Sequence, residues 1–448
     1  MALLTIRNLT VRFATSTGSF TAADGIDVRV DRGEVLAIVG ESGSGKSVSM
    51  LAAMGLLPDT ATVTADEMSF DGRDLLAMTA RERRQIIGRE ITMIFQEPIA
   101  SLNPSFTAGY QIEEVLRFNA GLSRKAARAR AIELFNQVGL PDPEGKLKSY
   151  PHQMSGGQSQ RVMIAMAIAT NPRLLIADEP TTALDVTIQA QVLEVLRTAQ
   201  QETGAAVILI THDLGVVAGI ADRVQVMYAG RTVETGEVGD IYYRARMPYT
   251  IGLLGSIPRL DNADKTVLAP VEGNPPSLLN LAPGCPFAER CPIVEPACRE
   301  LEPDLAPTDG SSHHQVACRR RDEIAEHAWT YADIYPLPAL HVADVDSVPR
   351  LERAEVLRID GLVREFPLLK GAIFKKRVGT VHAVDGVSFT LRPGRTLGLV
   401  GESGCGKSVT ARAVMGLLGE PVQVIAGRVL LDGQDLLTLD EPAMRKIR

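Results

Sequence analysis

The sequence predicts an α/β protein with more than one domain, and three observations lead to this fold class. Residues 35–39 form a short apolar run that precedes a glycine-rich loop and a segment with helical spacing. Residues 174–177 form a second apolar run, the pattern of a strand buried on both faces of a parallel sheet. The first arrangement returns near residue 401, which indicates a duplicated domain rather than a solenoid. With 448 residues, the chain is long enough for two or three domains.

The composition narrows the class of protein. Hydrophobic residues make up 45% and charged residues 23%, as in an average globular protein. A formal charge of −7 argues against nucleic acid as the main partner. The longest apolar run, residues 162–169, is far shorter than the roughly 18 residues that cross a bilayer. Arg7 and Asn8 lie where a signal peptide needs its apolar core, so we expect a cytosolic chain.

The glycine-rich loop carries the first chemical signal. Residues 40–47 have the pattern G-x4-G-K-S between a strand and a helix, which is the context that a phosphate-binding loop requires. Glycines let backbone N–H groups turn toward phosphates, Lys46 can reach the β- and γ-phosphates, and the Ser47 hydroxyl can bind Mg²⁺. We therefore expect ATP and Mg²⁺ here. The candidate contacts are Gly40, Ser42, Gly43, Ser44, Gly45, Lys46 and Ser47.

Two carboxylates follow the second apolar run. Asp178 is placed to hold the Mg²⁺ shell, and Glu179 is placed to orient and deprotonate an attacking water. Two acids at a strand end can also simply cap the next helix. The phosphate-binding loop elsewhere in the chain favours the catalytic interpretation.

A third motif begins a helix. Ser155, Gly156, Gly157 and Gln158 precede a helical stretch, and small residues there can form an anion-binding nest. A helix N-terminus capped by Ser155 is the simpler interpretation, but it leaves unexplained two glycines that cost helix stability.

In their order along the chain, these motifs resemble those of the ATP-binding cassette ATPases. The resemblance adds Gln96 as the glutamine that couples Mg²⁺ to the partner surface and His212 as the histidine that contacts the γ-phosphate. It makes residues 155–158 the signature, with small departures at Met154 and Ser159. Phe13 would stack on adenine, although a core phenylalanine is the alternative.

The resemblance implies a P-loop NTPase cassette with a mixed sheet and a helical subdomain near residues 97–154. The basic run 124–130 reads as the solvated face of an amphipathic helix capped by Ser123. We expect four regions: a first cassette (1–260), a Cys-rich and Pro-rich connecting domain (261–320), a linker (321–355) and part of a second cassette (356–448).

The second copy of the loop repeats the first 361 residues later. Its candidate nucleotide contacts are Gly401, Ser403, Gly404, Gly406, Lys407 and Ser408. Only 41 residues follow Lys407, so we expect a truncated cassette. The resemblance implies that ATP is sandwiched between one cassette's loop and another's signature, which makes a second cassette a required partner.

Residues 93–104 (MIFQEPIASLNP) are more specific and resemble importer ATPases for oligopeptides, dipeptides, glutathione and nickel. The resemblance implies an ATP-hydrolysing subunit of a peptide importer, peripheral on the cytoplasmic side of the membrane. Its partners would be two permeases and an extracytoplasmic binding protein. The alternatives are glutathione or nickel import, a soluble non-transport ATPase and an inactive fragment.

Four of the five cysteines cluster: Cys285, Cys291, Cys298 and Cys318. Reduced thiols in a cytosolic chain make a metal site the leading interpretation. The resembling family keeps this cysteine pattern, and the absence of two C-x2–4-C knuckles favours a [4Fe–4S] cluster over zinc. Free buried thiols are the third possibility. His313 and His314 could replace a ligand, but we expect them to be exposed loop residues.

Overall fold

The computed structural model describes residues 2–16, 18–182, 184–257, 270–308, 311–335, 348–349, 351–370, 376–402, 404–418 and 424–448. The chain divides into two compact units. Residues 1–183 and 188–339 form the first, and residues 184–187 and 340–448 form the second. Each unit is described below by itself.

An eight-stranded mixed sheet forms the centre of the first unit. Its five parallel strands are β7 (Ile91–Ile94), β8 (Leu174–Asp178), β9 (Ala206–Thr211), β3 (Val35–Val39) and β10 (Arg223–Tyr228). The antiparallel strands β11 (Arg231–Glu237), β13 (Ser311–Val316) and β12 (Ala306–Thr308) continue one edge. Every residue of β3, β8 and β9 is buried, so both faces of the central strands are covered, as their apolar sequences predict.

A second, antiparallel sheet packs over the first. Its strands are β1 (Ala2–Thr15), β2 (Gly18–Asp31), β4 (Ala61–Thr64), β5 (Glu67–Phe70) and β6 (Arg73–Asp74). A single hydrophobic core joins Leu4 of this sheet, Met50 of helix α1 (Lys46–Met54) and Ile38 of β3. Helix α1 is therefore held by contacts with both sheets, and the short loop of residues 40–45 connects its first turn to the end of β3.

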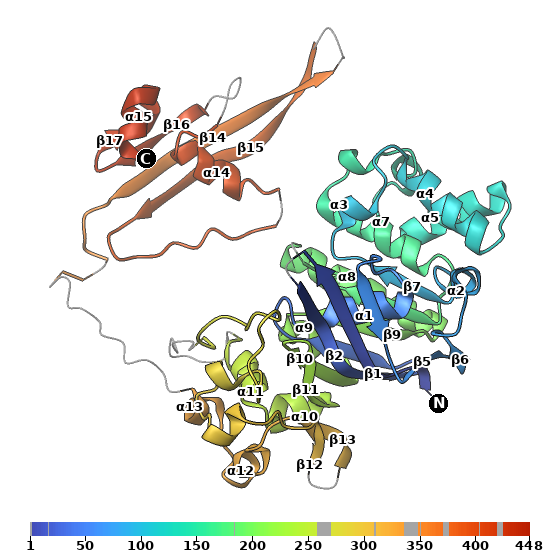
Figure 1. The fold of residues 1–448 in the computed structure, drawn as a ribbon. Coiled ribbons are helices and arrows are strands. Elements are labelled where there is room, and N and C mark those ends of the chain that lie inside the picture. Colours follow the sequence, from blue (N-terminus) through green and yellow to red (C-terminus); the bar gives the residue numbers. More distant parts are fainter. Residues whose placement is uncertain are drawn as a thin grey trace. The chain divides into compact units, whose positions relative to one another are not determined.

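A group of helices lies at one end of the first unit (Figure 1). It contains α3 (Pro98–Ser101), α4 (Ala108–Asn119), α5 (Arg124–Gln137), α6 (Pro143–Lys146) and α7 (Gly156–Ile168). The Ser123 side chain accepts a hydrogen bond from Ala126 N and begins α5, so the predicted cap is confirmed. Leu134 and Phe135 are buried while Arg124 and Arg128 are exposed, as the amphipathic interpretation requires.

The other helices of the first unit are α2 (Ala80–Ile86), α8 (Val186–Thr203) from Ile188 onward, α9 (Leu214–Val217), α10 (Val238–Arg244), α11 (Pro248–Gly255), α12 (Arg321–Glu326) and α13 (Tyr331–Ile334). Short 3₁₀ turns are η1 (Pro151–Gln153), η2 (Ala288–Arg290) and η3 (Pro296–Arg299).

Part of the region expected to be a linker is folded. Ile324 of α12 and Ile334 of α13 are buried in a small core with Ile251 of α11, and Tyr335 Oη donates a hydrogen bond of 2.9 Å to Pro248 O. Residues 321–335 therefore extend the first unit. The cause is a set of apolar contacts with α11, which the charged composition of the segment conceals.

The second unit contains an antiparallel sheet of β14 (Leu357–Lys370), β15 (Lys376–Leu391), β16 (Val424–Leu431) and β17 (Gln434–Asp435). Its other elements are α14 (Lys407–Val414), η4 (Leu436–Thr438) and α15 (Glu441–Ile447). Residues 396–400, which match β3 in sequence, do not form a strand, and Val400 is exposed. In the first unit β3 pairs with β9 and β10, whereas residues 396–400 have no such neighbouring strands within the described part of the second unit.

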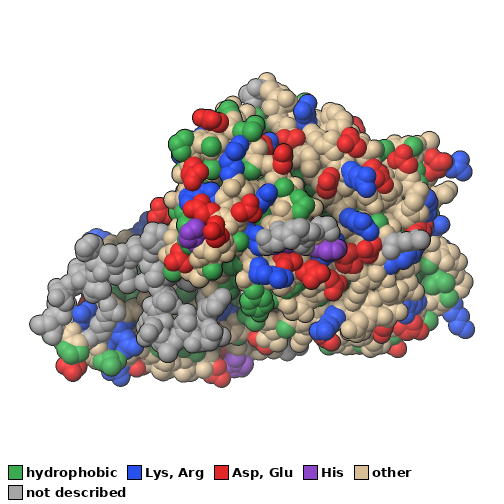
Figure 2. Space-filling model, turned by 90° about the horizontal axis from the view of Figure 1, so that it is seen from below, with side chains coloured by type: hydrophobic (Ala, Val, Ile, Leu, Met, Phe, Trp, Pro, Cys, Tyr) green, Lys and Arg blue, Asp and Glu red, His purple; other side chains and the backbone are tan. Residues whose placement is uncertain are grey.

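None of the helices built from described residues is long and apolar enough to span a membrane. On the face seen in Figure 2, acidic and basic side chains are interspersed. That face therefore does not present the field of a single charge sign that steers polyanions to a protein.

Candidate nucleotide-binding site

The loop between β3 and α1 depends on glycine at defined positions. Gly40, Gly43 and Gly45 have φ of 149°, 81° and 96°, values that side chains rarely tolerate. A Cβ on Gly40 would clash with the Met227 carbonyl oxygen, and one on Gly45 would lie 2.5 Å from Ala22 O. The loop is thus packed tightly against the surrounding backbone, which leaves its outer side for a ligand.

Lys46 is the first residue of α1 and its side chain is buried. Its Nζ donates hydrogen bonds to Gly40 O at 2.7 Å and to Glu41 O at 2.8 Å. Burial lowers the pKa of Lys46, and the nearby carboxylates of Glu179, Asp178 and Glu41 oppose this shift. The ammonium group is therefore held inside the loop, where phosphates would meet it.

Ser47 and Asp178 meet at the carboxyl ends of the parallel strands. Ser47 Oγ donates a hydrogen bond of 2.8 Å to Asp178 Oδ1. Burial raises the pKa of Asp178, although the bond from Ser47 opposes the shift. A hydroxyl and a carboxylate are oxygen ligands of the kind that Mg²⁺ prefers, so this pair fits the predicted ion.

Glu179 is the centre of a polar cluster. Its Oε2 accepts hydrogen bonds from Gln96 Nε2 at 2.9 Å and from Thr182 Oγ1 at 2.8 Å, and its Oε1 lies 3.3 Å from His212 Nδ1. Its φ of 47° is unusual for a residue with a side chain and turns the backbone sharply after β8. The structure thus brings together three side chains that the sequence named separately: Gln96, Glu179 and His212. Thr182 was not predicted, and its only signal is a hydroxyl three residues after the acid.

The predicted signature lies at the start of α7. Ser155 accepts a hydrogen bond from Gln158 N and caps the helix, while Gln158 Oε1 accepts one of 3.1 Å from Lys146 Nζ. A Cβ on Gly157 would lie 3.1 Å from Ile188, whereas one on Gly156 would meet open space. These partners lie outside residues 40–47, so the described contacts do not join the signature to the phosphate-binding loop.

Phe13, the proposed adenine contact, lies on β1. Its ring stacks on Phe20 with centroids 5.4 Å apart and an interplanar angle of 20°. The ring is only half-buried, so one part of this aromatic pair remains available at the surface.

At its described glycines, the second glycine-rich loop repeats the positive φ values of the first. Gly401, Gly404 and Gly406 have φ of 150°, 84° and 94°, and Lys407 Nζ donates to Gly401 O and Glu402 O, both at 2.6 Å. Ser408 is exposed, and Ser403 lies outside the described residues. The described part of the second unit has no strands beside residues 396–400. The φ values of the loop therefore do not depend on such neighbouring strands.

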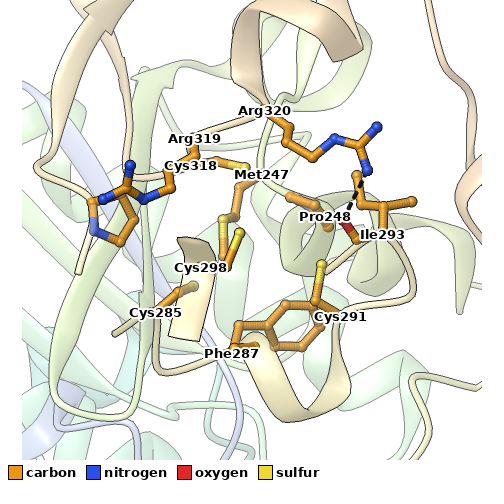
Figure 3. A pocket seen from close by; sticks show the side chains of 12 residues that line it. Met247, Pro248, Cys285, Phe287, Cys291, Ile293, Cys298, Cys318, Arg319 and Arg320 are labelled. Atoms are coloured by element: carbon orange, nitrogen blue, oxygen red, sulfur yellow. Dashed lines mark hydrogen bonds between the residues drawn. The ribbon is translucent and has the colours of Figure 1, made fainter. Parts of the chain in front are cut away.

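Cys285, Cys291, Cys298 and Cys318 line one small pocket of about 20 Å³ in the first unit (Figure 3). Burial raises the pKa of Cys291 to about 11 and that of Cys318 to about 12, which favours neutral thiols. Across the described residues, no three or more His, Cys, Asp or Glu side chains are arranged to hold a metal ion. The structure thus gathers the four predicted ligands without a ready-made ligand geometry.

His314 does not behave as an exposed loop residue. Its ring is buried and its Nε2 lies 2.9 Å from Glu234 Oε1, which also accepts from Arg246 N at 2.8 Å. The expectation was wrong because β13 pairs with β11 and carries His314 into the core, while His313 stays exposed.

Two side chains distant in sequence hold Glu41, the second residue of the phosphate-binding loop. Tyr249 Oη accepts a hydrogen bond of 2.8 Å from Glu41 N, and Arg290 forms an ion pair with the Glu41 carboxylate. Arg290 belongs to the cysteine-rich segment, 249 residues away, so no local pattern could have predicted this contact.

Comparison with known proteins gives two family matches. The ABC transporter profile matches residues 23–182 and 384–447, and a profile for the C-terminal region of oligopeptide/dipeptide transporters matches residues 233–298. The chain is 46% identical to the oligopeptide transport ATP-binding protein OppD of Mycobacterium tuberculosis over all of its length and 71% of that protein. It is 51% identical to the dipeptide transport ATP-binding protein DppD of Escherichia coli over 68% of this chain and 93% of that protein. For DppD of Bacillus subtilis, the identity is 50% over 73% and 97%.

Proposed function

The chain belongs to the ABC transporter family, and from this premise we propose that it hydrolyses ATP to energise the import of peptides through a membrane permease. The observation that carries the catalytic part is the cluster in which Glu179 is held by Gln96 and Thr182 beside His212. ATPase activity is the function of this family.

Different residues of the chain are assigned to phosphate binding, metal binding and proton transfer. Lys46 and the backbone N–H groups of the loop would bind the phosphates. Ser47 and Asp178, together with Gln96, would hold Mg²⁺, which would supply positive charge near the phosphate oxygens. Glu179 accepts a proton from the attacking water, and two donated hydrogen bonds fix its Oε2 for that role. Gln96 and His212 position this acid. Gln96 would also couple Mg²⁺ to the partner surface, His212 would contact the γ-phosphate, and Phe13 would stack on the adenine.

The substrate class comes from the relatives. Three of them are named as oligopeptide or dipeptide transport ATP-binding proteins, and their matches cover between 68% and 100% of the chain at 46–51% identity. The match of residues 233–298 to the C-terminal region of oligopeptide/dipeptide transporters supports the same class.

The proposed assembly follows from family membership. The chain would dock as a peripheral subunit on the cytoplasmic side of the membrane, bound to two permeases and supplied by an extracytoplasmic binding protein. A second cassette would complete each ATP site, because the signature at Ser155–Gln158 makes no described contact with the loop at Gly40–Ser47. Residues 356–448 would contribute part of that cassette, since their loop copies the first and the family profile matches 384–447.

The proposed domains are a first cassette at 1–260, a cysteine-rich domain at 261–320 that residues 321–335 extend, a linker in the remainder of 321–355 and a partial second cassette at 356–448. The cysteine-rich domain would hold a [4Fe–4S] cluster, with zinc as the alternative. The four sulfurs at one pocket support this idea, but buried neutral thiols must deprotonate and move to become ligands.

The test of the catalytic assignment is Glu179→Gln in the full chain with its permeases. Phosphate release should fall by about 10²–10⁴-fold, while the affinity for a fluorescent ATP analogue is retained. The matched control is Glu194→Gln, an exposed acid on α8. Turnover that survives in Glu179→Gln would exclude Glu179 as the base. Uptake of a labelled peptide by vesicles with the assembled transporter, lost in the same variant, tests the substrate class.

A further inference from the structure

We propose that Arg290 is a positioning residue for nucleotide binding: by pairing with Glu41 it neutralises the one carboxylate within the phosphate-binding loop and couples the cysteine-rich segment to the ATP site. This inference rests on the proposed function, because it concerns the affinity of the same loop for ATP.

The ion pair is bidentate and its geometry is fixed. Arg290 Nη1 lies 2.7 Å from Glu41 Oε2, and Nη2 lies 3.0 Å from Oε1. The Arg290 side chain is 6% exposed. Its Nε donates to Glu272 O at 3.0 Å, and its guanidinium lies over the rings of Tyr228 and Phe287. A paired and stacked guanidinium of this kind has little freedom to leave its partner.

Three side chains bond to Glu41, and one of them is the phosphate-binding lysine. Its N–H donates to Tyr249 Oη, its carboxylate pairs with Arg290, and its carbonyl accepts from Lys46 Nζ. The Glu41 charge acts at Lys46, where it opposes the lowering of the lysine pKa by burial. Arg290 therefore holds Glu41, whose carbonyl oxygen accepts the hydrogen bond from Lys46 Nζ.

Charge gives the main reason that this pair matters for binding. ATP brings several negative charges into a loop that already contains the Glu41 carboxylate, and like charges at a partly buried site repel with little screening. The Arg290 guanidinium offsets the carboxylate. Without Arg290, Glu41 would be an unpaired negative charge next to the incoming phosphates.

Arg290 also lies beside the cysteines. It ends the turn η2 and directly precedes Cys291, whose N–H donates to Ala288 O at 3.4 Å. Ala288, Phe287 and Cys291 line the cysteine pocket (Figure 3). A change at that pocket that moves η2 therefore also moves the guanidinium. Since coupling free energies are reciprocal, any such change that weakens ATP binding is itself disfavoured when ATP is bound.

The test uses the full chain and a fluorescent ATP analogue. Arg290→Met should weaken the analogue's affinity by about 5-fold or more. The double variant Arg290→Met/Glu41→Gln should bind more tightly than Arg290→Met, because the unpaired charge is gone. Arg290→Lys should retain part of the affinity, since it keeps the charge and loses the bidentate geometry. If Arg290 served only to pack Tyr228 and Phe287, removing the Glu41 charge would not recover binding, and the proposal would be overturned.

Arg320→Met is the matched control. Arg320 lies in the same segment, its side chain is 18% exposed, and its ion-pair partners, Glu295 and Glu323, both lie outside the phosphate-binding loop. Its replacement should change the affinity by less than about 2-fold, well below the coupling expected for Arg290. Arg320 also lines the cysteine pocket, so an equal loss in both variants would show that the ion pair with Glu41 adds nothing to a general disturbance of the pocket, and it would overturn the proposal.

A measurement on the wild-type chain keeps the proposal open to refutation if Arg290→Met fails to fold. Hydrogen exchange in residues 284–298 should slow when the ATP analogue binds, and this response should disappear in Glu41→Gln. Unchanged exchange in the wild type would overturn the coupling alone. Failure of the wild type to bind the analogue would instead overturn the proposed ATP-binding function itself.

Discussion

Ser47 Oγ and Asp178 Oδ1, 131 positions apart in the sequence, are joined by a hydrogen bond of 2.8 Å. The bond connects the start of α1 to the end of β8 and places a hydroxyl and a carboxylate where one Mg²⁺ can bind both. It also ties a buried carboxylate to the fold, with consequences for stability as well as for binding.

Asp178→Asn should make the nucleotide-free protein more stable and abolish Mg²⁺-dependent nucleotide binding. Burial raises the pKa of Asp178 in the folded state. The neutral side chain therefore adds to the free energy of unfolding below the ordinary aspartate pKa, and this stabilisation is lost as pH rises through the raised pKa. The advantage of Asn should therefore grow with pH. Thermal unfolding at pH 4 and pH 8 measures it, and a variant that melts lower than wild type at pH 8 would contradict the prediction.

Gln96→Ala should slow phosphate release by roughly 10-fold, since one hydrogen bond to a charged group is worth about 1.5 kcal/mol. The lost bond is the 2.9 Å contact from Gln96 Nε2 to Glu179 Oε2. Gln96→Glu should be slower still, because it places a second carboxylate beside Glu179. Steady-state kinetics compare the two, and a rate for Gln96→Glu above that of Gln96→Ala would refute this account of the contact.

Gly45→Ala should destabilise the chain more than Gly43→Ala. Both glycines have positive φ, so each alanine carries a backbone penalty of about 1–2 kcal/mol. Only the Cβ at position 45 would also collide, with Ala22 O at 2.5 Å, while position 43 has nothing within 4 Å. Denaturant unfolding of the two variants measures the free energy of unfolding that each substitution costs. The difference between them is the cost of the collision at position 45, and equal costs would show that the loop shifts to avoid it.

His314→Leu should reduce the free energy of unfolding by about 1–3 kcal/mol, the cost of leaving a buried acceptor with one fewer donor. The acceptor is Glu234, which is 0% exposed. The exposed neighbour provides the control, as His313→Leu should have a much smaller effect. The comparison fails if the two variants unfold at the same denaturant concentration.

Cys291→Ser tests the proposed cluster. Protein purified without oxygen should show a broad visible absorbance that this variant loses and that Cys405→Ser, outside the four-cysteine pocket, retains. A colourless wild-type protein that contains zinc would exclude the cluster.

Local patterns predicted much of this fold. The apolar run at residues 35–39 forms β3 within the same bounds, and Ser123 and Ser155 cap the helices that follow them, because strand burial and helix capping depend on neighbouring residues. The proximity of Gln96, Glu179 and His212 could be predicted only from the family resemblance, because the strands that precede them lie far apart in the sequence.

Other features depend on contacts that no sequence window contains. Arg290 pairs with Glu41 across 249 residues. His314 is buried because β13 joins the main sheet, and residues 396–400 stay outside any sheet although their sequence matches β3. In the last two cases the neighbouring strands, rather than the segment's own propensity, decide the outcome.

The packing of α12 and α13 against α11 sets where the first cassette can be cut for study. A chain ended at residue 320 would expose Ile251 and remove Ile324, Ile334 and Tyr335 from the core that they share. Each buried apolar side chain of this size is worth about 1.5–3 kcal/mol, so such a shortened protein should aggregate. A cassette expressed alone should extend at least to Tyr335, whose hydroxyl donates a hydrogen bond to the Pro248 carbonyl oxygen.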